Sequence, residues 1–587
     1  MTKPTYILGI SCYYHDSGAV LLKDGKVVFA AQEERYTRKK QDESLPINVI
    51  NHALEHAGIT IADIDAIGFY EKPLLKFFDR ILHTYFKTWP WGFFQYQRAM
   101  KEWMMKKLWI PQNIEKELGY KGKVFYVQHH ESHAASSFYC SGFDEAVIVT
   151  VDGVGEWATT TIGQGKGNDI TLKKEIHFPH SLGLLYSAIT YYLGFKVNSA
   201  EYKVMGLAPY GEPKYMEQMR ELITIKEDGS FALNMKYFTY EYGLRMTGKK
   251  LEKLFGQPRR QSEGELTQFH KDIAASLQKM TEDAMLSICT YAKEITDCNK
   301  LCLSGGVALN CVCNGVLLRS GLFEDIFIQP ASGDAGGALG VALAIWHKQF
   351  GGKRMPKMDN VYWGTEYSDD DIEALLKEEQ LPYNRCSDTS QLLALSSQLL
   401  EGNNVIGWFQ GRMEFGPRAL GNRSIIADAR NKENWKKVNL KIKFRESFRP
   451  FAPTVLEEDV HRYFDLDRES PYMLLVADVK PGKREEIPAV THVDGSARIQ
   501  TINRSQNEKY YDLIAAFKKK TGCSVIINTS FNVRGEPIVE SPKDALNCFL
   551  NTYMDYLIMG NILLSKSDMP KEKILKSEEY LQTFELD

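Results

Sequence analysis

The chain contains few cysteines, and none of them has the spacing of a redox or zinc site. Ten cysteines are scattered over 587 residues without a CxxC pair, which leaves a thiol-redox function without support. Cys311 and Cys313 stand in an apolar, glycine-flanked segment, as buried thiols do, and this usage is typical of a reducing cytoplasm. The sequence also lacks a GxSxG elbow and a GxxxxGKS/T loop. Neither a hydrolase of that type nor a Walker ATPase is therefore indicated.

Long apolar segments and a strong charge of one sign are absent as well. No run of about 20 apolar residues marks a membrane span, and the apolar run after MTKP is too short for a signal peptide. The net charge is −3, so bulk electrostatics points to neither nucleic acid nor an anionic membrane as a partner. The composition, 44% hydrophobic and 25% charged, is that of a globular protein. We expect a cytoplasmic protein without nucleic-acid or membrane partners.

Two similar strand–loop–hairpin patterns occur in the first part of the chain. The first is YILGIS, CYYHDSG and AVLLKDGKVVFAAQEE, where the residues KDGK between alternating apolar runs predict a tight turn. The second is KVFYVQ, a histidine-bearing helix and the DG-containing hairpin AVIVTVDGVGEWATTTIGQG. Two copies predict a duplicated α/β unit, which resembles the actin, sugar-kinase and Hsp70 ATPases (ASKHA). The glycine-rich KLCLSGGVALN and SGDAGGALG would then present backbone N–H groups to a nucleotide.

The length predicts two or more domains. Residues 1–352 form the predicted ASKHA-type domain, and residues 71–118, rich in Trp, Phe, Tyr and Lys, are predicted to be a helical insertion within it. The Gly-, Pro- and Lys-containing residues 353–365 are a predicted linker, and 366–587 a second α/β domain.

His129 and His133 are the strongest candidates for metal ligands. Residues at i and i+4 project from the same face of a helix, so the two imidazoles can converge on one ion. Asp152 and Asp334 follow in glycine-rich segments and could add oxygen ligands. Such a set suits iron, manganese or zinc better than calcium or magnesium. The alternative is that these are ordinary surface or core histidines.

Basic residues beside glycines and asparagines characterise the second half. Guanidinium groups bind phosphates bidentately, so this group predicts a pocket for a polyanionic substrate: Arg418, Arg423, Lys443, Arg445, Arg449 and Arg498. Asn528, Thr529 and Ser530 end a predicted strand and could complete the pocket. The alternative is that these arginines form ordinary surface salt bridges.

Nearly the whole chain resembles the O-carbamoyltransferases of the NodU/CmcH type, which modify nodulation factors, cephalosporins and aminoglycosides. The segments that carry the resemblance are HHESHAAS, VDGVGE, AEYKVMGLAPYG, LSGGVALN, SGDAGGALG, FGPRALGNRSI, FRPFAP and NTSFNVRGEPIV. The resemblance implies an ASKHA domain related to the tRNA threonylcarbamoyl-transferase ATPase, fused to a YrdC-like α/β domain.

The implied reaction has two steps. The YrdC-like domain makes carbamoyl adenylate from carbamoyl phosphate and ATP, and the N-terminal domain transfers the carbamoyl group to a hydroxyl of a small-molecule acceptor, with release of AMP. An ion, Fe(II) in the first place with Mn or Zn as alternatives, would hold nucleotide phosphate, and Mg could accompany ATP. A homodimer is possible, since dimers are the commonest oligomers of soluble proteins.

The resemblance also implies roles for individual residues. His129, His133, Asp152 and Asp334 would hold the ion, and Lys203, Gly305, Gly306 and Asn310 would contact the nucleotide. Lys40 would meet the adenylate. His15 is the candidate general base for the acceptor hydroxyl, with a hydrogen-bonded turn residue as the alternative. The carbamoyl-phosphate and ATP pocket would consist of Arg418, Lys443, Arg445, Arg449, Arg498, Asn528 and Ser530.

Two other functions stay open from the sequence. One is a nucleotide-binding scaffold or regulatory protein that no longer turns over. The other is a tRNA threonylcarbamoyl-type or hydrogenase-maturation protein. The missing zinc-finger CxxC motifs argue against the hydrogenase-maturation type, and the absence of a strong basic charge argues against a tRNA substrate. Trp89, Trp91, Phe93 and Phe94 could line an acceptor pocket, but core or interface positions are the simpler interpretation.

Overall fold

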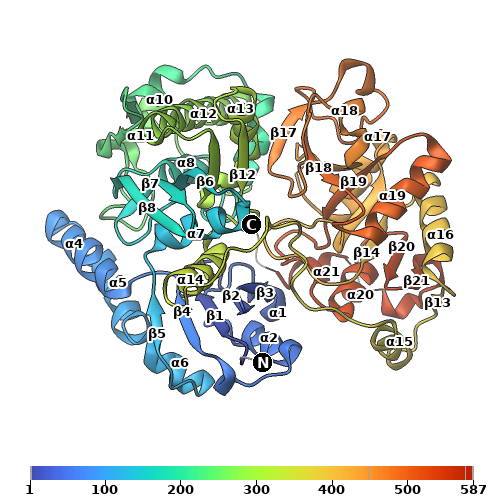
Figure 1. Ribbon diagram of the computed structural model, residues 1–587. Coiled ribbons are helices and arrows are strands. Elements are labelled where there is room, and N and C mark those ends of the chain that lie inside the picture. Colours follow the sequence, from blue (N-terminus) through green and yellow to red (C-terminus); the bar gives the residue numbers. More distant parts are fainter. Residues whose placement is uncertain (1–2, 447, 575–576, 585–587) are drawn as a thin grey trace. The chain divides into compact units, whose positions relative to one another are not determined.

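The computed structural model describes residues 3–446, 448–574 and 577–584 (Figure 1). Contacts group the described residues into two compact units. Unit 1 comprises residues 1–33 and 41–358, and unit 2 comprises residues 34–40 and 359–587. The short segment 34–40 therefore groups with unit 2, although it lies within the predicted first domain. The predicted domain limits, 1–352 and 366–587, remain a prediction about which parts of the chain fold independently.

Unit 1 contains two five-stranded sheets with the same strand order. The first has the order β3-β2-β1-β4-β5 and the second β8-β7-β6-β11-β12. In each sheet the first strand pairs antiparallel with the next strand of a hairpin and parallel with a later strand, which pairs parallel with the last one. The predicted duplicated α/β unit is confirmed, and its topology is actin-like. The strands are β1 (Tyr6–Ser11), β2 (Gly18–Lys23), β3 (Lys26–Gln32), β4 (Ala66–Phe69), β5 (Val124–Tyr126), β6 (Glu145–Val151), β7 (Ala158–Lys166), β8 (Asp169–His177), β11 (Lys300–Ser304) and β12 (Asp325–Ile328).

Two buried helices lie between these sheets. Helix α14 (Asp334–Lys348) packs on β1 and β2, helix α7 (His129–Ser141) packs on β6 and β11, and the two helices pack on each other (Figure 1). Glycines permit this close approach. A Cβ atom at Gly9 would lie 1.9 Å from the carbonyl oxygen of Ala338, and one at Gly340 would lie 1.7 Å from that of Ser132. Sheet, α14, α7 and sheet therefore form successive layers, and the first residues of both helices bear candidate ligands.

Two of the remaining elements of unit 1, α2 (Ile47–Ala57) and η1 (Ile61–Asp63), connect β3 to β4 of the first sheet, and α2 packs on β2 and β3. Outside the segment 71–118, the others lie between β8 and β12 in the chain. They are α8 (Leu182–Tyr192), α9 (Glu201–Leu207), η4 (Ala208–Tyr210), α10 (Met216–Leu222), β9 (Ile223–Ile225), β10 (Phe231–Leu233), η5 (Met235–Tyr237), α11 (Lys249–Phe255), α12 (Gln268–Thr296), η6 (Gly306–Leu309) and α13 (Cys311–Arg319).

The segment 71–118 is helical and projects from unit 1 as two consecutive helical runs (Figure 1). The outward run consists of α3 (Pro73–Leu75), the π-helical η2 (Lys76–Leu82) and α4 (His83–Thr88). The return run consists of α5 (Phe93–Glu102) and the π-helical η3 (Trp103–Lys107), and α6 (Ile110–Leu118) leads back to β5. Within the described residues, no helix is both long and apolar enough to cross a membrane.

Unit 2 is built on a nine-stranded mixed sheet with the order β13-β21-β20-β14-β15-β19-β16-β18-β17. Its strands are β13 (Asn384–Arg385), β14 (Ile406–Phe409), β15 (Arg423–Asp428), β16 (Ala452–Leu456), β17 (Leu475–Asp478), β18 (Ser496–Ile502), β19 (Val525–Ser530), β20 (Tyr556–Met559) and β21 (Ile562–Ser565). Its helices are α1 (Glu34–Thr37), α15 (Asp369–Glu378), α16 (Thr389–Glu401), α17 (Lys432–Lys436), η7 (Lys437–Ile442), η8 (Glu457–Asp459), α18 (Val460–Tyr463), η9 (Pro481–Lys483), α19 (Glu508–Thr521), α20 (Pro542–Leu550), η10 (Lys566–Asp568), η11 (Lys571–Lys573) and α21 (Ser577–Leu581).

Candidate active site

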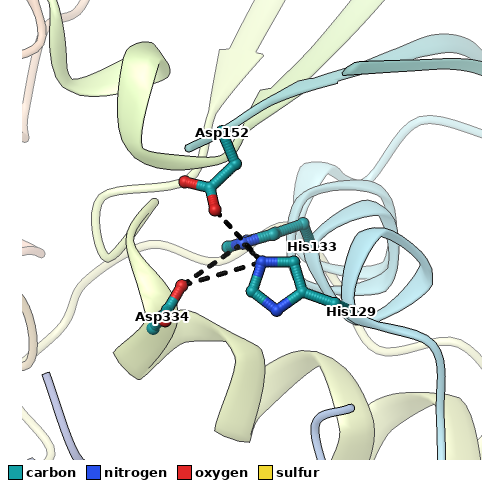
Figure 2. Close-up of side chains that lie close together, drawn as sticks. All are labelled: His129, His133, Asp152 and Asp334. Carbon is teal, nitrogen blue, oxygen red and sulfur yellow. Dashed lines mark hydrogen bonds and ion pairs between the residues drawn. The ribbon is translucent and has the colours of Figure 1, made fainter. Parts of the chain in front are cut away.

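Four buried side chains from three parts of unit 1 meet at one point (Figure 2). His129 and His133 come from the first turns of α7, Asp152 follows β6, and Asp334 begins α14. One donor atom of each lies within 4.8 Å of the others. The two Nε2 atoms of the histidines are 3.1 Å apart, and His129 Nε2 lies 3.1 Å from Asp152 Oδ2. The structure thus brings together all four predicted metal ligands.

The spacing of these atoms fits one first-row metal ion. Two ligands about 2.1 Å from an ion and at right angles to each other are about 3 Å apart. Asp334 Oδ1 lies 3.7 Å from His129 Nε2 and 3.8 Å from His133 Nε2. Within the described part of the chain this Asp334 oxygen is buried and accepts no hydrogen bond, which is costly unless a cation approaches it. Imidazole and carboxylate donors together favour iron, manganese or zinc.

The pKa values describe the site in the absence of an ion. Burial opposes the charge of His129, but its hydrogen bond to Asp152 and the charge of Asp334 raise its pKa. Burial and the charge of His129 hold the pKa of His133 well below its usual value. Burial raises the pKa of Asp334 to about 6. One positive charge therefore lies between two carboxylates, where a metal cation could replace it.

A glycine turn connects this cluster to the predicted nucleotide loop. Gly306 follows β11, and its N–H donates to Asp152 Oδ1 at 2.8 Å. Gly305 has a φ of +90°, and a Cβ atom there would lie 2.3 Å from the carbonyl oxygen of Val151. Only glycine therefore fits this close approach of the loop to the end of β6. Asp152 is thus positioned by the loop that we predicted to bind a nucleotide.

His15 lies on a strained loop close enough for its charge to interact with the cluster. Tyr13 and Asp16 have φ values of 66° and 58°, a conformation that few non-glycine residues adopt and that is enriched at functional sites. His15 Nδ1 lies 3.2 Å from Asp16 Oδ2. Burial lowers the pKa of His15, but the charge of Asp16 and those of Asp334 and Asp152 outweigh it and raise the value to about 10. In the ion-free state His15 therefore carries a proton at neutral pH.

Basic residues of the insertion also approach this loop. Lys76 is buried and ion-paired with buried Glu71, and its Nζ lies 5.5 Å from the centre of the Tyr14 ring. Lys107 Nζ lies 5.9 Å from the same ring, and burial followed by repulsion from Lys76 lowers its pKa to about 8. Arg80 donates to the carbonyl oxygen of Gly155 at 2.5 Å. The sequence interpretation missed these residues, because it considered only the aromatic residues of the insertion.

The other predicted nucleotide contacts have structural partners of their own. Lys203 is buried in α9, and its Nζ lies 5.9 Å from the centre of the Phe195 ring. Asn310 caps α13 by accepting from the N–H of Cys313 at 3.0 Å, and it donates to Gln278 at 2.9 Å. Lys40 belongs to the segment that groups with unit 2. Their contact with a nucleotide stays a prediction.

In unit 2, Lys443 organises the end of β19. It is buried, and its Nζ donates to the backbone oxygens of Ser530 at 2.7 Å and Asn532 at 2.8 Å and to the Ser530 hydroxyl at 3.1 Å. Burial, reinforced by the charges of Arg445 and Arg449, holds its pKa well below the usual value. Phe444, between Lys443 and Arg445, has a φ of 47°. Lys443 thus holds Ser530 and Asn532 in place.

The sheet register brings other predicted pocket residues to the same face. Gln500 of β18 pairs with Thr454 of the parallel strand β16, so Arg498, two residues earlier, lies beside Ala452. Ala452 in turn pairs with Asn528 of β19. Asn528 donates to Gln500 at 2.8 Å, and side chains two residues apart on a strand share a face. Arg498, Asn528 and Ser530 therefore lie on one face of the sheet.

The loop that carries Arg418 covers this face. Its neighbour Ala419 accepts a hydrogen bond from Asn528 at 3.4 Å, and Leu420 accepts one from Gln500 at 2.9 Å. Arg449 lies 3.7 Å from Glu446 (Nη1 to Oε2), and Arg445 donates to Asn439 at 2.7 Å.

Arg423, in contrast, is fully buried. Its guanidinium donates to the backbone oxygens of Gln410, Gly411, Asn422, Thr365 and Glu540. The guanidinium group thus connects several loops. This structural role accounts for an arginine at this position without an anion-binding role.

Both halves of the chain match one protein family. Residues 6–343 match the family described as Carbamoyltransferase N-terminus, and residues 397–566 match Carbamoyltransferase C-terminus. The chain belongs to the carbamoyltransferase family. The predicted resemblance is thereby confirmed, and the protein is a transferase enzyme.

Several known proteins are similar in sequence to this carbamoyltransferase-family chain. An uncharacterized protein of Synechocystis sp. is 51% identical over 99% of this chain and 100% of that protein. Nodulation protein NolNO of Sinorhizobium fredii is 40% identical over 94% of this chain and 79% of that protein. The 3'-hydroxymethylcephem-O-carbamoyltransferase of Streptomyces clavuligerus is 36% identical over 46% of this chain and 50% of that enzyme.

Proposed function

We propose that the protein is an ATP-dependent O-carbamoyltransferase that carbamoylates a hydroxyl group of a small natural-product or sugar-like molecule. The observation that carries the proposal is the position of Asp152, which joins the histidine cluster and the Gly306 loop through its two oxygens. Family membership supports the carbamoyl group as the transferred group, and one relative is named as an O-carbamoyltransferase.

The first step belongs to residues 366–587, the predicted YrdC-like domain. Carbamoyl phosphate, water and ATP give carbamoyl adenylate, phosphate and pyrophosphate. The phosphate groups need fixed cations, which Arg418, Arg445, Arg449 and Arg498 would supply through bidentate hydrogen bonds. Lys443, Asn528 and Ser530 would position this pocket, since Lys443 already holds the end of β19.

The second step belongs to residues 1–352, with 353–365 as the linker between the two domains. The acceptor hydroxyl oxygen bonds to the carbamoyl carbon, the bond from that carbon to the adenylate oxygen breaks, and AMP leaves. The residues Lys40, Lys203, Gly305, Gly306 and Asn310 would hold the adenylate. The ion held by His129, His133, Asp152 and Asp334, Fe(II) in the first place with Mn or Zn as alternatives, would supply positive charge beside the phosphate and the carbonyl group; Mg would enter with ATP.

His15 is the residue that we assign to the hydroxyl proton. It must be neutral to accept that proton, whereas the carboxylates of Asp16, Asp334 and Asp152 keep it protonated in the ion-free state. Neutralisation of Asp334 and Asp152 by a bound cation would remove two of these influences and make His15 a better base.

The first half-reaction can be tested without knowledge of the acceptor. The iron-loaded full chain is incubated with ATP and carbamoyl phosphate, and carbamoyl adenylate is sought by mass spectrometry together with pyrophosphate release. Arg449→Ala should abolish both signals. Arg504→Ala, which removes an exposed arginine paired with Glu508 and Asp512, should retain them. A folded protein that forms no adenylate would overturn the proposal.

A further inference from the structure

The helical arm, residues 73–109, exposes aromatic side chains that no other part of unit 1 covers. At its end Phe86, Trp91 and Phe94 are 72%, 78% and 74% exposed, and Trp89 and Phe93 are 55% and 41% exposed. α4 and α5 project away from the two sheets of unit 1 (Figure 1). Clustered exposed side chains of this size mark an interaction surface.

The arm is fixed in position, so these side chains are presented outward. Tyr85 of α4 stacks on Tyr96 of α5 with ring centres 3.7 Å apart. Lys87 forms an ion pair with the buried Glu241 at 2.6 Å, and Gln95 donates to the backbone oxygen of Tyr240 at 3.1 Å. One side of the arm therefore holds it to unit 1, and the other side carries the exposed rings.

The exposed end of the arm is also basic. Residues 83–101 contain Lys87, Arg98 and Lys101 and no aspartate or glutamate, a net charge of +3 in a chain whose total is −3. On α5, Phe94, Arg98 and Lys101 follow one another at i, i+4 and i+7 and share a helix face, and all three are exposed. Aromatic and basic groups therefore face the same way.

We propose that the end of this arm is a docking surface for an anionic lipid bilayer, with its aromatic rings inserted among the headgroups. Trp and Phe beside Lys and Arg are the side chains that interfacial segments use, and the positive charge complements anionic lipids. A protein partner fits less well, because lysine is depleted at protein interfaces. The enzyme would thereby act at a membrane surface. The net charge of −3 predicted no anionic membrane as a partner. This proposal differs from that expectation because the positive charge is local to the arm.

The test uses the full chain and two kinds of vesicle. One is phosphatidylcholine alone, and the other is an equal mixture of phosphatidylcholine and phosphatidylglycerol. We expect flotation with the mixed vesicles, a shift of tryptophan emission to shorter wavelength, and much weaker binding to phosphatidylcholine. Binding should fall as salt is raised. Failure of the wild-type chain to bind the mixed vesicles would overturn the proposal.

Paired variants separate the two contributions. Trp91→Ser with Phe94→Ser should lose binding, whereas Tyr553→Ser, at an aromatic residue 58% exposed in unit 2, should keep it. Arg98→Glu with Lys101→Glu should weaken binding at least about 25-fold, since each cation near an anionic surface contributes about fivefold. Lys519→Glu with Lys520→Glu, at exposed lysines of α19, is the charge control.

Two outcomes would contradict the docking surface. In one, the Trp91/Phe94 variant binds the mixed vesicles as the wild type does. In the other, the wild type ignores vesicles and forms a dimer that this variant dissociates, so that the surface joins two copies of the chain. Adenylate formation does not enter these measurements, so they are independent of the proposed reaction.

Discussion

The carboxylate of Asp152 accepts a hydrogen bond at 2.8 Å from the backbone N–H of Gly306. The other oxygen of the same carboxylate lies 3.1 Å from His129 Nε2. One side chain thus fixes the distance between the histidine cluster and the predicted nucleotide loop. Both the ion and the adenylate should therefore depend on it.

Asp152→Asn should separate the two half-reactions. The amide keeps the shape of the carboxylate but lacks its charge, so affinity for the ion should fall by at least about a hundredfold. Carbamoyl transfer should be lost, while adenylate formation in unit 2 should remain. Metal content by mass spectrometry and the two activities are measured in parallel, with Asp283→Asn, at a half-buried residue paired with Lys279, as the control. Loss of adenylate formation in Asp152→Asn would contradict the division of labour.

Ion binding should depend on pH through Asp334. Burial raises the pKa of Asp334 to about 6 in the ion-free protein, and only the ionised carboxylate is a ligand. Asp334 should therefore add a decline of about tenfold for each pH unit below pH 6 to the pH dependence that comes from His129, whose raised pKa means that its ring must also lose a proton before it binds an ion. Competition with a chelator at a series of pH values measures this, and a flat profile between pH 7 and pH 5 would exclude Asp334 as a ligand.

Lys443→Met should abolish adenylate formation and loosen the end of β19. The ammonium group donates to oxygens of Ser530 and Asn532, and the apolar replacement leaves these oxygens without that donor, at about 1–3 kcal/mol. Pyrophosphate release and thermal unfolding are measured beside Lys519→Met. A variant with unchanged pyrophosphate release would show that the pocket does not need Lys443.

Local patterns predicted those parts of the fold that depend on neighbouring residues. The hairpin of β2 and β3 forms at the predicted turn, because Asp24 and Gly25 adopt the positive φ values that this turn requires. Strands β16 and β18 were not predicted. Pro453 interrupts the propensity of β16, so its pairing in the sheet identifies it. β18 alternates polar with apolar residues around Arg498, which is a strand pattern that the sequence interpretation missed.

The same distinction applies to the candidate site. The spacing of His129 and His133 places two imidazoles on one helix face, which the sequence alone provides. Asp152 and Asp334 join them only through the stacking of α7 and α14 between two sheets. The Asp152–Gly306 hydrogen bond and the approach of Lys76 and Lys107 to Tyr14 depend on contacts between distant segments. No local pattern in one sequence encodes them.

Gly305→Ala should destabilise the protein more than an ordinary glycine substitution does. A methyl group there would lie 2.3 Å from the carbonyl oxygen of Val151, at a φ of +90°. We expect a loss of about 3 kcal/mol from strain and overpacking together. Gly321→Ala is the control, because that glycine has a φ of +65° with open space around it and should lose only about 1 kcal/mol. Urea unfolding compares them, and equal losses would contradict the close contact.

His130 should make the ion-free protein sensitive to acid. Burial and the charge of His129 lower its pKa from 6.5 to about 3, although the Ala158 carbonyl oxygen 2.9 Å away favours the protonated ring. The other ring nitrogen lies 2.6 Å from the Thr150 hydroxyl. The unfolded chain binds a proton below pH 6.5 and the folded chain does not, so the stabilisation present above pH 6.5 is lost as the pH falls toward 3.

The difference is measurable between pH 7 and pH 5. One such histidine should reduce the free energy of unfolding by about 2 kcal/mol over this range. His130→Gln, which keeps a donor and an acceptor but cannot be protonated, should lose correspondingly less, whatever its stability at pH 7. His177→Gln removes an exposed imidazole and should follow the wild type. If His130→Gln shows the wild-type change, His130 is not the residue whose protonation opposes folding, and other histidines with lowered pKa values, such as His133 or His180, account for the acid sensitivity.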